Sequence, residues 1–218
     1  AIALNHNIKL QNIDYIQIHP TTLYSTKKGR RFLISESVRG EGAVLFNSHM
    51  ERFVDELLPR DVVAKAIQEE MKKDNKPYVW LSMKPIPTEM IKNHFPNIYK
   101  HCLEEGYDVT KECIPVVPSQ HYFMGGIDVD KYSKTSMDRL YAVGETACNG
   151  VHGKNRLASN SLLESMVFAK RAAGEMTAEF DSTEYRNTEN MDLSPYSDLK
   201  KWNKENKEIL LEAIDKGE

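Results

Sequence analysis

The chain has 218 residues, of which 40% are hydrophobic and 28% are charged, and its formal net charge is −3. This composition is typical of a globular protein, and the slight excess of negative charge argues against nucleic acid as a partner. No apolar run reaches the roughly 18 residues that a membrane-spanning helix needs, so we expect no membrane segment. The three cysteines are far apart and form no CxxC motif, which argues against a disulfide framework or a metal site and indicates a reducing, cytoplasmic location.

The first seven residues, AIALNHN, have the pattern of the end of an amphipathic helix, and no methionine precedes them. A natural protein rarely begins inside a helix. We therefore expect the chain to be a fragment that lacks a front half. The alternative is a complete domain that was released from a tag.

The first half of the chain alternates between strand-like and helix-like patterns. Residues 61–73 are the clearest case, because apolar side chains recur there at helical spacing, and Asp61 near the start suits the helix dipole. In chain order we expect a strand and turn over 13–24, a short helix over 32–40, a strand over 43–47, the helix over 61–73, a strand over 78–83 and a helix over 88–105 that Pro96 can break.

The second half is less regular. Pro115 and Pro118 predict edge or irregular extended structure over residues 114–130, and Gly125 and Gly126 permit a bulge or a close approach of two backbones. Beyond them we expect a short buried strand over 140–143, a strong helix over 160–176 suited to packing on a sheet, a polar linker over 181–193 and a charged helix over 197–217.

The most informative stretch is residues 149–163, NGVHGKNRLASNSLL, a polar loop that opens directly onto the helix expected at 160–176. The first N–H groups of a helix have no partner within it, and the helix dipole makes that end positive. A phosphate, a carboxylate or a reduced, anionic ring can bind there. Arg156 adds a planar, two-pronged donor for a carboxylate. This pattern favours a small-molecule redox or transferase site over a scaffold.

Two further arginines stand at the ends of expected elements. Arg39 in VRGEG and Arg60 in LPRDVV adjoin turn-forming residues, and with Arg156 they can clamp a dicarboxylate, since each carboxylate takes a bidentate guanidinium. Glu36 and Glu41 can orient them. The alternative is a set of surface ion pairs, each worth little.

Other polar residues are ambiguous when taken singly. His19 in QIHPTT and His121 in SQHYFMGG can each be a buried structural histidine, and so can His152 beside the anion loop. Glu145 follows the strand expected at 140–143, where a carboxylate can accept hydrogen bonds from the hydroxyls of a ribose or ribitol. A helix cap or a solvated turn is the alternative.

The order of these motifs along the chain is more specific than any one of them. IHPTTLY, ISESVRGEGA, LPRDVV, HYFMGGI, YAVGE and VHGKNRLASNSLLE follow one another within residues 16–176. In this order they resemble the flavoprotein family of succinate dehydrogenases and fumarate reductases. The form RLASNSLLE favours the branch of the family that oxidises L-aspartate, because the succinate and fumarate enzymes more often have a G-A-N-S-L-L form.

The resemblance implies an α+β fold, in which a capping domain of the fumarate-reductase type interrupts a Rossmann-like FAD domain. Residues 1–13 and 120–180 would belong to the FAD domain, 14–119 to the α+β cap, and 181–218 to a linker and the start of a C-terminal helical domain. The family's glycine-rich phosphate loop lies upstream of the cap, and this chain has no G-x-G-x-x-G. We therefore expect these residues alone to be inactive.

The resemblance also implies roles at the substrate. Arg60 matches the proton-transfer residue. A guanidinium needs desolvation and a nearby carboxylate to carry a proton, and Glu36, which we expect to be catalytic, or Asp61 can supply that carboxylate. Ser35 and Glu36 match a Thr-Glu pair that contacts the substrate. The carboxylate binders of the family match His19, His121 and Arg156.

At the cofactor, Glu145 matches the acidic residue that binds the ribityl or ribose hydroxyls of FAD. Ser161 and Leu162 match the residues whose backbone N–H groups face the flavin pyrimidine at a helix N-terminus. A reduced flavin carries negative charge on that side of the ring, so the positive end of a helix suits it. Lys154 departs from the family, which usually has a small residue there.

The activity implied is FAD-dependent oxidation of L-aspartate to iminoaspartate, in which the hydrogen on Cα leaves as a hydride. Oxygen or fumarate then reoxidises the flavin. This reaction opens de novo NAD biosynthesis, which implies a functional link to quinolinate synthase. The alternatives are a flavoprotein subunit of succinate dehydrogenase or fumarate reductase, and a non-enzymatic binding module that reuses the fold.

Overall fold

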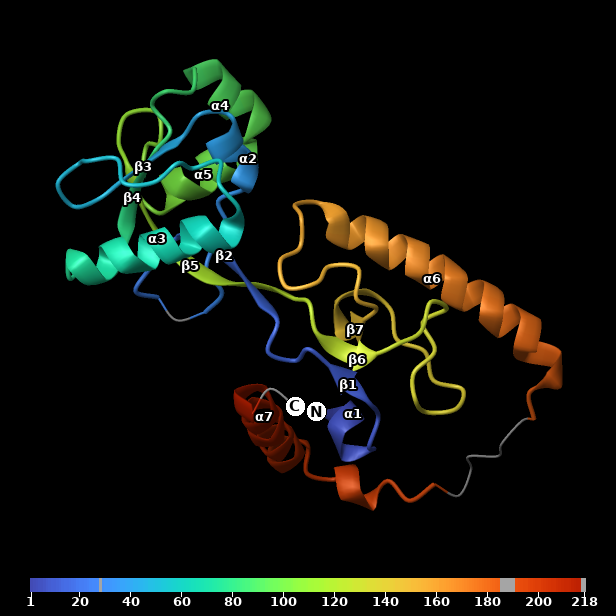
Figure 1. Cartoon of the computed structure of the whole chain (residues 1–218). Coiled ribbons are helices and arrows are strands. Elements are labelled where there is room, and N and C mark those ends of the chain that lie inside the picture. The colour runs from blue at the N-terminus through green and yellow to red at the C-terminus, as the bar shows by residue number, and fades with distance from the viewer. Residues whose placement is uncertain (28, 185–190, 217–218) are drawn as a thin grey trace. The chain divides into compact units, whose positions relative to one another are not determined.

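The computed structural model describes residues 1–27, 29–184 and 191–216, which form two compact units (Figure 1). The central unit is Ile18–His121, and the terminal unit combines Ala1–Gln17 with Tyr122–Glu218. The chain passes between the units twice, after Gln17 and after His121.

The central unit is built on a four-stranded sheet with the strand order β2-β5-β4-β3. Its strands are β2 (Ile16–Leu23), β3 (Val44–Phe46), β4 (Val79–Ser82) and β5 (Ile114–Phe123). β4 pairs antiparallel with both β3 and β5, and Leu45 lies opposite Leu81 in the register. The strands expected at 13–24, 43–47 and 78–83 are therefore confirmed, each with slightly shorter bounds.

Four helices accompany this sheet: α2 (Glu36–Gly40), α3 (Arg60–Lys73), α4 (Thr88–His94) and α5 (Pro96–Glu104). The break at Pro96 is confirmed, because a proline suits the first position of a helix but not its interior. The short helix expected at 32–40 is confirmed only from Glu36 onward. Its start is set by Ser35, whose hydroxyl accepts a hydrogen bond from the backbone N–H of Ser37.

The core of the central unit is continuous and apolar. Side chains from β3, β4, β5 and the four helices meet in it, with Val63 and Ile67 of α3 and Ile91 of α4 fully buried. The largest buried side chains of this core are Ile34, Leu45, Ile67, Leu81, Met83, Ile91 and Ile114. The rest of the unit, including its polar cluster, is held by this core.

The expectation of an edge or irregular strand around Pro115 is wrong, because β5 lies inside the sheet between β2 and β4. Pro115 is tolerated there because it stands opposite Trp80 and contributes only its carbonyl, which accepts a hydrogen bond from the N–H of Tyr24 just beyond the end of β2. A proline can therefore occupy an inner strand where no N–H is required of it.

The terminal unit has a smaller sheet and longer helices. Its sheet has the order β1-β6-β7, formed by β1 (Leu10–Gln11), β6 (Gly126–Asp128) and β7 (Ala147–Cys148). The other elements are α1 (Ile2–Asn5), the 3₁₀ turns η1 (Gly144–Thr146), η2 (Phe180–Ser182) and η3 (Ser194–Tyr196), and the helices α6 (Asn160–Glu179) and α7 (Leu199–Lys216).

The close backbone approach expected at Gly125 and Gly126 is confirmed. A Cβ atom on Gly125 would lie 1.8 Å from the carbonyl oxygen of Asn12, and one on Gly126 would lie 2.4 Å from that of Thr146. Gly126 also has a φ of +138°, which side chains rarely adopt. The two glycines thus let the backbones of Asn12 and Thr146 lie close to the start of β6.

The buried strand expected over residues 140–143 is wrong. The backbone of Leu140 bonds to Thr135 and Met137, the N–H of Ala142 donates to the carbonyl of Ser133, and Val143 is exposed. The segment forms one isolated bridge, between Lys134 and Tyr141. Its apolar residues are used in a local turn instead of a sheet, and strand pairing begins further on, at β7.

The helix expected at 160–176 is confirmed as α6, but its packing is narrower than its composition predicts. Only Glu164, Phe168 and Ala172 are buried, a single row of residues four apart. The neighbouring sheet, with strands of two or three residues, is too short to cover a helix of 20 residues, so Leu162 and Met166 are exposed.

The helix expected at 197–217 is confirmed as α7, and part of the linker expected at 181–193 lies outside the described residues. Within the parts of the chain that are described, no helix is both long enough and apolar enough to span a bilayer. The cysteines Cys102, Cys113 and Cys148 are free thiols.

We predict that Gly125→Ala lowers the free energy of unfolding by about 3 kcal/mol, because the added methyl group must displace the backbone of Asn12. Gly174→Ala is the matched control in the same unit, since it lies in α6 with open space around it and should raise stability by about 0.5–1 kcal/mol. Urea unfolding followed by circular dichroism measures both. Equal effects of the two substitutions would contradict this account of the glycine contact.

Candidate functional site

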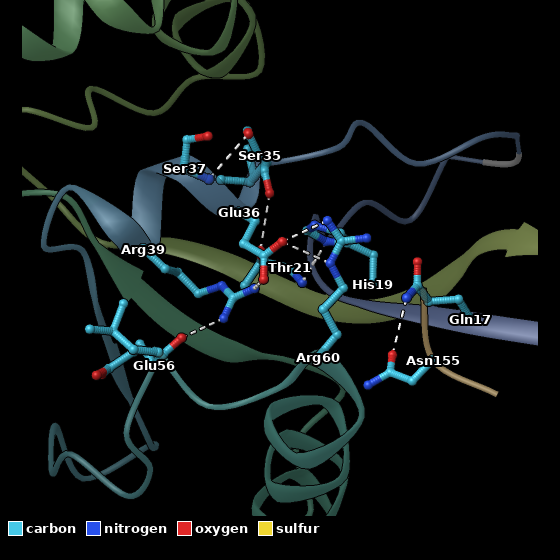
Figure 2. Close-up of polar contacts among 12 residues, drawn as sticks. Gln17, His19, Thr21, Ser35, Glu36, Ser37, Arg39, Glu56, Arg60 and Asn155 are labelled. Atoms are coloured by element: carbon cyan, nitrogen blue, oxygen red, sulfur yellow. Dashed lines mark hydrogen bonds and ion pairs between the residues drawn. The ribbon is translucent and has the colours of Figure 1, made fainter. Parts of the chain in front are cut away.

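Five of the residues singled out in the sequence lie in the central unit, namely His19, Ser35, Glu36, Arg60 and His121. They come from β2, α2, α3 and β5, which the apolar core holds together. Figure 2 shows polar contacts of His19, Ser35, Glu36 and Arg60. Glu145, Arg156, Ser161 and Leu162 lie in the terminal unit.

An ion pair joins the buried Arg60 to the partly exposed Glu36. Arg60 is the first residue of α3 and is only 8% exposed. Its Nε and Nη2 atoms donate to Glu36 Oε2 over 2.9 and 2.6 Å (Figure 2). The Glu36 side chain is one-third exposed, so this carboxylate lies in contact with both solvent and the buried guanidinium. The carboxylate and the desolvation that a proton-carrying arginine needs are both present.

Arg39 approaches the same carboxylate from the other side. Its Nη2 lies 3.6 Å from Glu36 Oε1, and its Nη1 donates to the backbone carbonyl of Glu56 over 2.5 Å. Arg39 is 2% exposed, and its Nε and Nη2 have no hydrogen-bond acceptor among the residues that the structure describes. Burial lowers the pKa of Arg39 below its usual value, and Arg60 acts in the same direction, while Glu36 and Glu56 oppose both.

The expectation that Glu36 orients Arg39 is confirmed by this contact. The two residues are three positions apart, which places them on one face of a helix. Glu56 gave no such signal. Its carboxylate is buried, accepts from the N–H of Leu45 and pairs with Arg52, so it fixes the loop that leads to Arg60.

His19 is neutral and has a defined tautomer. It is 1% exposed, and its Nδ1 accepts a hydrogen bond from the N–H of Thr21 over 3.2 Å, which leaves the ring proton on Nε2. Burial lowers the pKa of His19 to about 3, and the nearby Arg60, His121 and Arg39 add to the effect. Its ring packs edge-on against His121 with centroids 5.1 Å apart. The pair therefore offers imidazole N–H groups without a charge on His19.

Two smaller expectations have different outcomes. Ser35 caps α2 through its hydroxyl, as described above, next to Glu36. Glu41, expected to orient an arginine, lies instead 3.5 Å from the Nδ1 of His94.

In the terminal unit, Arg156 is buried in the loop that precedes α6. Its guanidinium carbon lies 4.4 Å from the ring centroid of Tyr122, and its Nη1 donates to the carbonyl of Leu157. The backbone carbonyl of Arg156 accepts from the side chain of Gln17 over 2.7 Å. Lys154, two residues earlier, places its ammonium 5.2 Å from the ring centroid of Tyr15.

The N-terminus of α6 is open. Within the described parts of the chain no side chain caps it, its first turn has no acidic residue, and Ser159 before it has a left-handed conformation with a φ of 64°. The backbone N–H groups of Ser161 and Leu162 belong to this first turn, where no partner within the helix is available. The arrangement suits an anionic group, as the loop composition predicts.

Glu145 lies in η1, beside the first turns of α6. A Cβ on Gly144 would be 3.4 Å from the hydroxyl of Ser165, which shows how closely the two elements pack. One carboxylate oxygen of Glu145 accepts from the N–H of Phe123 over 2.9 Å. The residue is exposed, so its other oxygen can accept from a hydroxyl.

The comparison with protein families decides the classification. Residues 1–162 match the family described as FAD binding domain. The chain belongs to this family of FAD-binding flavoproteins. The flavoprotein family predicted from the six ordered motifs is thereby confirmed.

Relatives in this flavoprotein family include L-aspartate oxidases. The chain is 54% identical over 215 residues to that of Clostridium perfringens, a match covering 98% of this chain and 48% of the relative. It is 56% identical over 195 residues to that of Clostridium acetobutylicum, covering 89% of this chain and 45% of the relative. The chain therefore spans about half the length of the curated relatives that it matches.

Solved structures of the family are also similar. Quinol fumarate reductase of E. coli has a TM-score of 0.76 and 32% identity, covering 86% of this chain and 36% of that one. The Sdh1 complex of Mycobacterium smegmatis has a TM-score of 0.68 and 36% identity, covering 92% and 35%. The predicted α+β flavoprotein fold is confirmed by these similarities.

We predict that His19 stays neutral down to at least pH 5, which an NMR titration of its imidazole can follow. Because its pKa is lowered from 6.5 to about 3 on folding, the unfolded chain binds the proton first as the pH falls. Above pH 6.5 the neutral His19 costs no stability. As the pH falls from 6.5 toward 3, the free energy of unfolding should decrease by up to about 1.4 kcal/mol per pH unit. His19→Gln should lack this part of the pH dependence, and titration of His19 near pH 6.5 would contradict the prediction.

Proposed function

We propose that this chain supplies the substrate-binding side of an FAD-dependent L-aspartate oxidase. The observation that carries the proposal is the ion pair of the buried Arg60 with Glu36, beside a neutral His19. The guanidinium groups of Arg39 and Arg60 and the imidazole N–H of His19 lie near the carboxylate of Glu36. These donors outnumber the acceptors, so they suit a substrate with two carboxylates. The identity of 54% to an L-aspartate oxidase supports this choice over a fumarate reductase, for which it is 32%.

In this proposal the central unit is the cap, and residues 1–17 with 122–180 form part of the FAD-binding domain. His19 donates its Nε2–H to a substrate carboxylate, His121 binds beside it, and Ser35 contributes its hydroxyl. Arg156 binds a carboxylate through its guanidinium. An uncharged donor at His19 suits a site that already holds Arg39 and Arg60, because a third cation there would raise the electrostatic cost.

The residues of the terminal unit fit one end of FAD. The uncapped N–H groups of Ser161 and Leu162 suit a ring that becomes negative on reduction, and the exposed oxygen of Glu145 suits a sugar hydroxyl. FAD, when bound, supplies the acceptor for the hydride that leaves the Cα of aspartate. The chain's own part is to bind the two carboxylates, orient Cα and exclude water.

Arg60 is the proposed proton carrier. When fumarate is the oxidant, the carbon that does not receive the hydride must take a proton, and we assign its delivery to the Arg60 guanidinium. Glu36 contacts both Arg60 and solvent, so it can return a proton to Arg60 after each transfer. Burial and the Glu36 contact are what make this role chemically feasible for a guanidinium.

The finer parts of the function are proposals that follow from the same assignment. They are oxygen or fumarate as the acceptor, the first step of NAD biosynthesis, a functional link to quinolinate synthase, and a cytoplasmic location. A succinate dehydrogenase or fumarate reductase subunit stays the second candidate, favoured by the TM-score of 0.76 to quinol fumarate reductase.

An exchange experiment tests the proposed activity. In the L-aspartate oxidase of Clostridium perfringens, the segment matched by this chain is replaced by these residues. We expect the purified, FAD-containing product to release hydrogen peroxide from L-aspartate. A folded product that retains FAD but oxidises succinate instead would favour the second candidate, and one that oxidises neither would refute an oxidase role.

We further predict that Arg60→Lys in this enzyme lowers kcat by about 100-fold or more, since a positioned proton donor contributes about 10²–10⁴-fold. KM for the dicarboxylate should change much less. Arg52→Lys is the control, because the side chain of Arg52 is exposed and a lysine there can still pair with Glu56. Steady-state kinetics measures both variants. Similar kcat values for the two would contradict the role of Arg60.

A further inference from the structure

A second carboxylate, that of Glu56, lies buried in the central unit beside the arginine cluster. Glu56 is 3% exposed, whereas the side chain of Glu36 is one-third exposed. A buried carboxylate is costly unless hydrogen bonds and opposite charge compensate for the lost water. Neither the proposed carboxylate binding nor the proposed proton transfer uses Glu56, so its burial needs another explanation.

The side chain of Glu56 ties its loop to the edge of the sheet. Its Oε1 accepts a hydrogen bond from the backbone N–H of Leu45 in β3 over 2.8 Å. The exposed Arg52 donates to both carboxylate oxygens, and an exposed pairing of this kind adds little stability. The bond to Leu45 is therefore the main tie, and the position of Glu56 follows that of β3.

The backbone of Glu56 holds Arg39. The Nη1 of Arg39 donates to the carbonyl oxygen of Glu56 over 2.5 Å (Figure 2). The Nε and Nη2 atoms of Arg39 have no hydrogen-bond acceptor within the described ranges of the chain. The Glu56 carbonyl therefore decides where this buried guanidinium lies.

Glu56 also precedes the exposed turn that leads to Arg60. Residues 57–59 are exposed, while Glu56 before them and Arg60 after them are buried. The turn is closed locally, by a bond from the N–H of Leu57 to the side chain of Asp55. Because an exposed turn contributes little packing, Glu56 is the buried anchor that fixes the start of α3 from the loop side.

The two arginines that Glu56 controls meet different oxygens of one carboxylate. Arg60 donates to Oε2 of Glu36, and the Nη2 of Arg39 lies 3.6 Å from Oε1. A shift of Glu56 would move both guanidinium groups relative to Glu36. Displacements of about 1 Å in a catalytic group can cost about 10²-fold in rate.

We propose that Glu56 is a positioning residue for proton delivery: its carbonyl places the Arg39 guanidinium and its loop places Arg60 against the carboxylate of Glu36. The proposal rests on the proposed function, in which Arg60 carries the proton and Glu36 returns it. Glu56 needs no contact with the substrate or with the flavin for this role.

The FAD-containing enzyme of the exchange experiment tests this role. Glu56→Ala removes the carboxylate and leaves the backbone carbonyl without its anchor. With fumarate as the oxidant, we expect kcat to fall by about 10-fold or more, because the proton donor is misplaced. KM for fumarate should change by less than about 2-fold, since a loss confined to the transition state leaves ground-state binding intact. Glu56→Gln can still accept from the Leu45 N–H and should lose only about 3-fold.

A comparison of two oxidants separates positioning from a general structural role. Reoxidation of the flavin by oxygen places no proton on a substrate carbon. Peroxide release from L-aspartate should therefore fall much less in Glu56→Ala than fumarate reduction does. The solvent isotope effect on fumarate reduction should also increase, because proton delivery then limits turnover. Equal losses with the two oxidants would overturn the proposal.

Glu70→Gln is the matched control for the loss of a buried carboxylate. Glu70 is 9% exposed in the same unit, and its side chain accepts from Asn47 and Lys73. This variant should lose stability but keep its kcat with both oxidants. An equal loss of fumarate reduction in Glu70→Gln, or a folded Glu56→Ala with unchanged kcat, would overturn the positioning role.

The variants also separate this proposal from the proposed function. Circular dichroism and FAD content show whether each variant is folded, and if Glu56→Ala is not, Glu56→Gln is judged by the same two-oxidant comparison. If the Glu56 variants have no effect while Arg60→Lys lowers kcat, the positioning role is refuted and the proposed function stands. An Arg60→Lys variant with unchanged kcat would instead refute the proton-carrying role itself.

Discussion

The burial of Arg60 against Glu36 is the interaction on which the rest of the site depends. A buried guanidinium is costly unless a carboxylate and good hydrogen bonds compensate for the lost water. The position of Arg60 makes this cost higher, because Arg60 is the first residue of α3 and a cation at a helix N-terminus opposes the helix dipole. Glu36 is the first residue of α2, where the dipole favours a carboxylate. Helix stability therefore gives no reason for an arginine at this position. The central unit tolerates Arg60 there because the apolar core fixes the ends of α2 and α3, and because Glu56 fixes the loop that leads into α3. We infer that the arrangement serves a reaction instead of helix stability.

The positive charge around Glu36 also determines the state of His19. With Arg39 and Arg60 nearby and almost no exposure, a third cation is unfavourable, and the imidazole stays neutral. The bond from the Thr21 N–H to Nδ1 then decides which nitrogen carries the proton. The partly exposed carboxylate of Glu36, two buried guanidinium groups and one oriented N–H form a local environment that is net positive and rich in donors. Such an environment favours dianions over neutral or cationic ligands, and it does so before any substrate contact is considered.

Features that depend on the local sequence, such as helices and helix breaks, could be predicted, whereas features that depend on which strands pair could not. The helix α3 follows from apolar periodicity, the break at Pro96 from proline stereochemistry, and the role of Gly125 from the need for space near a crossing backbone. The place of β5 inside the sheet was missed because the cost of Pro115 depends on which neighbour needs its N–H. Residues 140–143 were misassigned because an apolar run does not reveal whether a partner strand exists. Among site residues, Arg39 carried a helical-spacing signal, whereas Glu56 acts through contacts distant in sequence.

In the proposed function, the polar cluster of the central unit recognises a carboxylate and not an ammonium group. Arg39 and Arg60 are cationic, His19 offers a donor, and Glu36 is bonded to Arg60. Because an ammonium needs acceptors, we expect these side chains to bind a carboxylate of the four-carbon diacid, and the amine to be recognised by other residues. That division suits an enzyme for which L-aspartate is the donor and fumarate an acceptor, because the two share their carboxylates and differ in the amine. It also accounts for similarity to both aspartate oxidases and fumarate reductases: the clusters that bind the diacid can be retained while the group that distinguishes the substrates changes elsewhere.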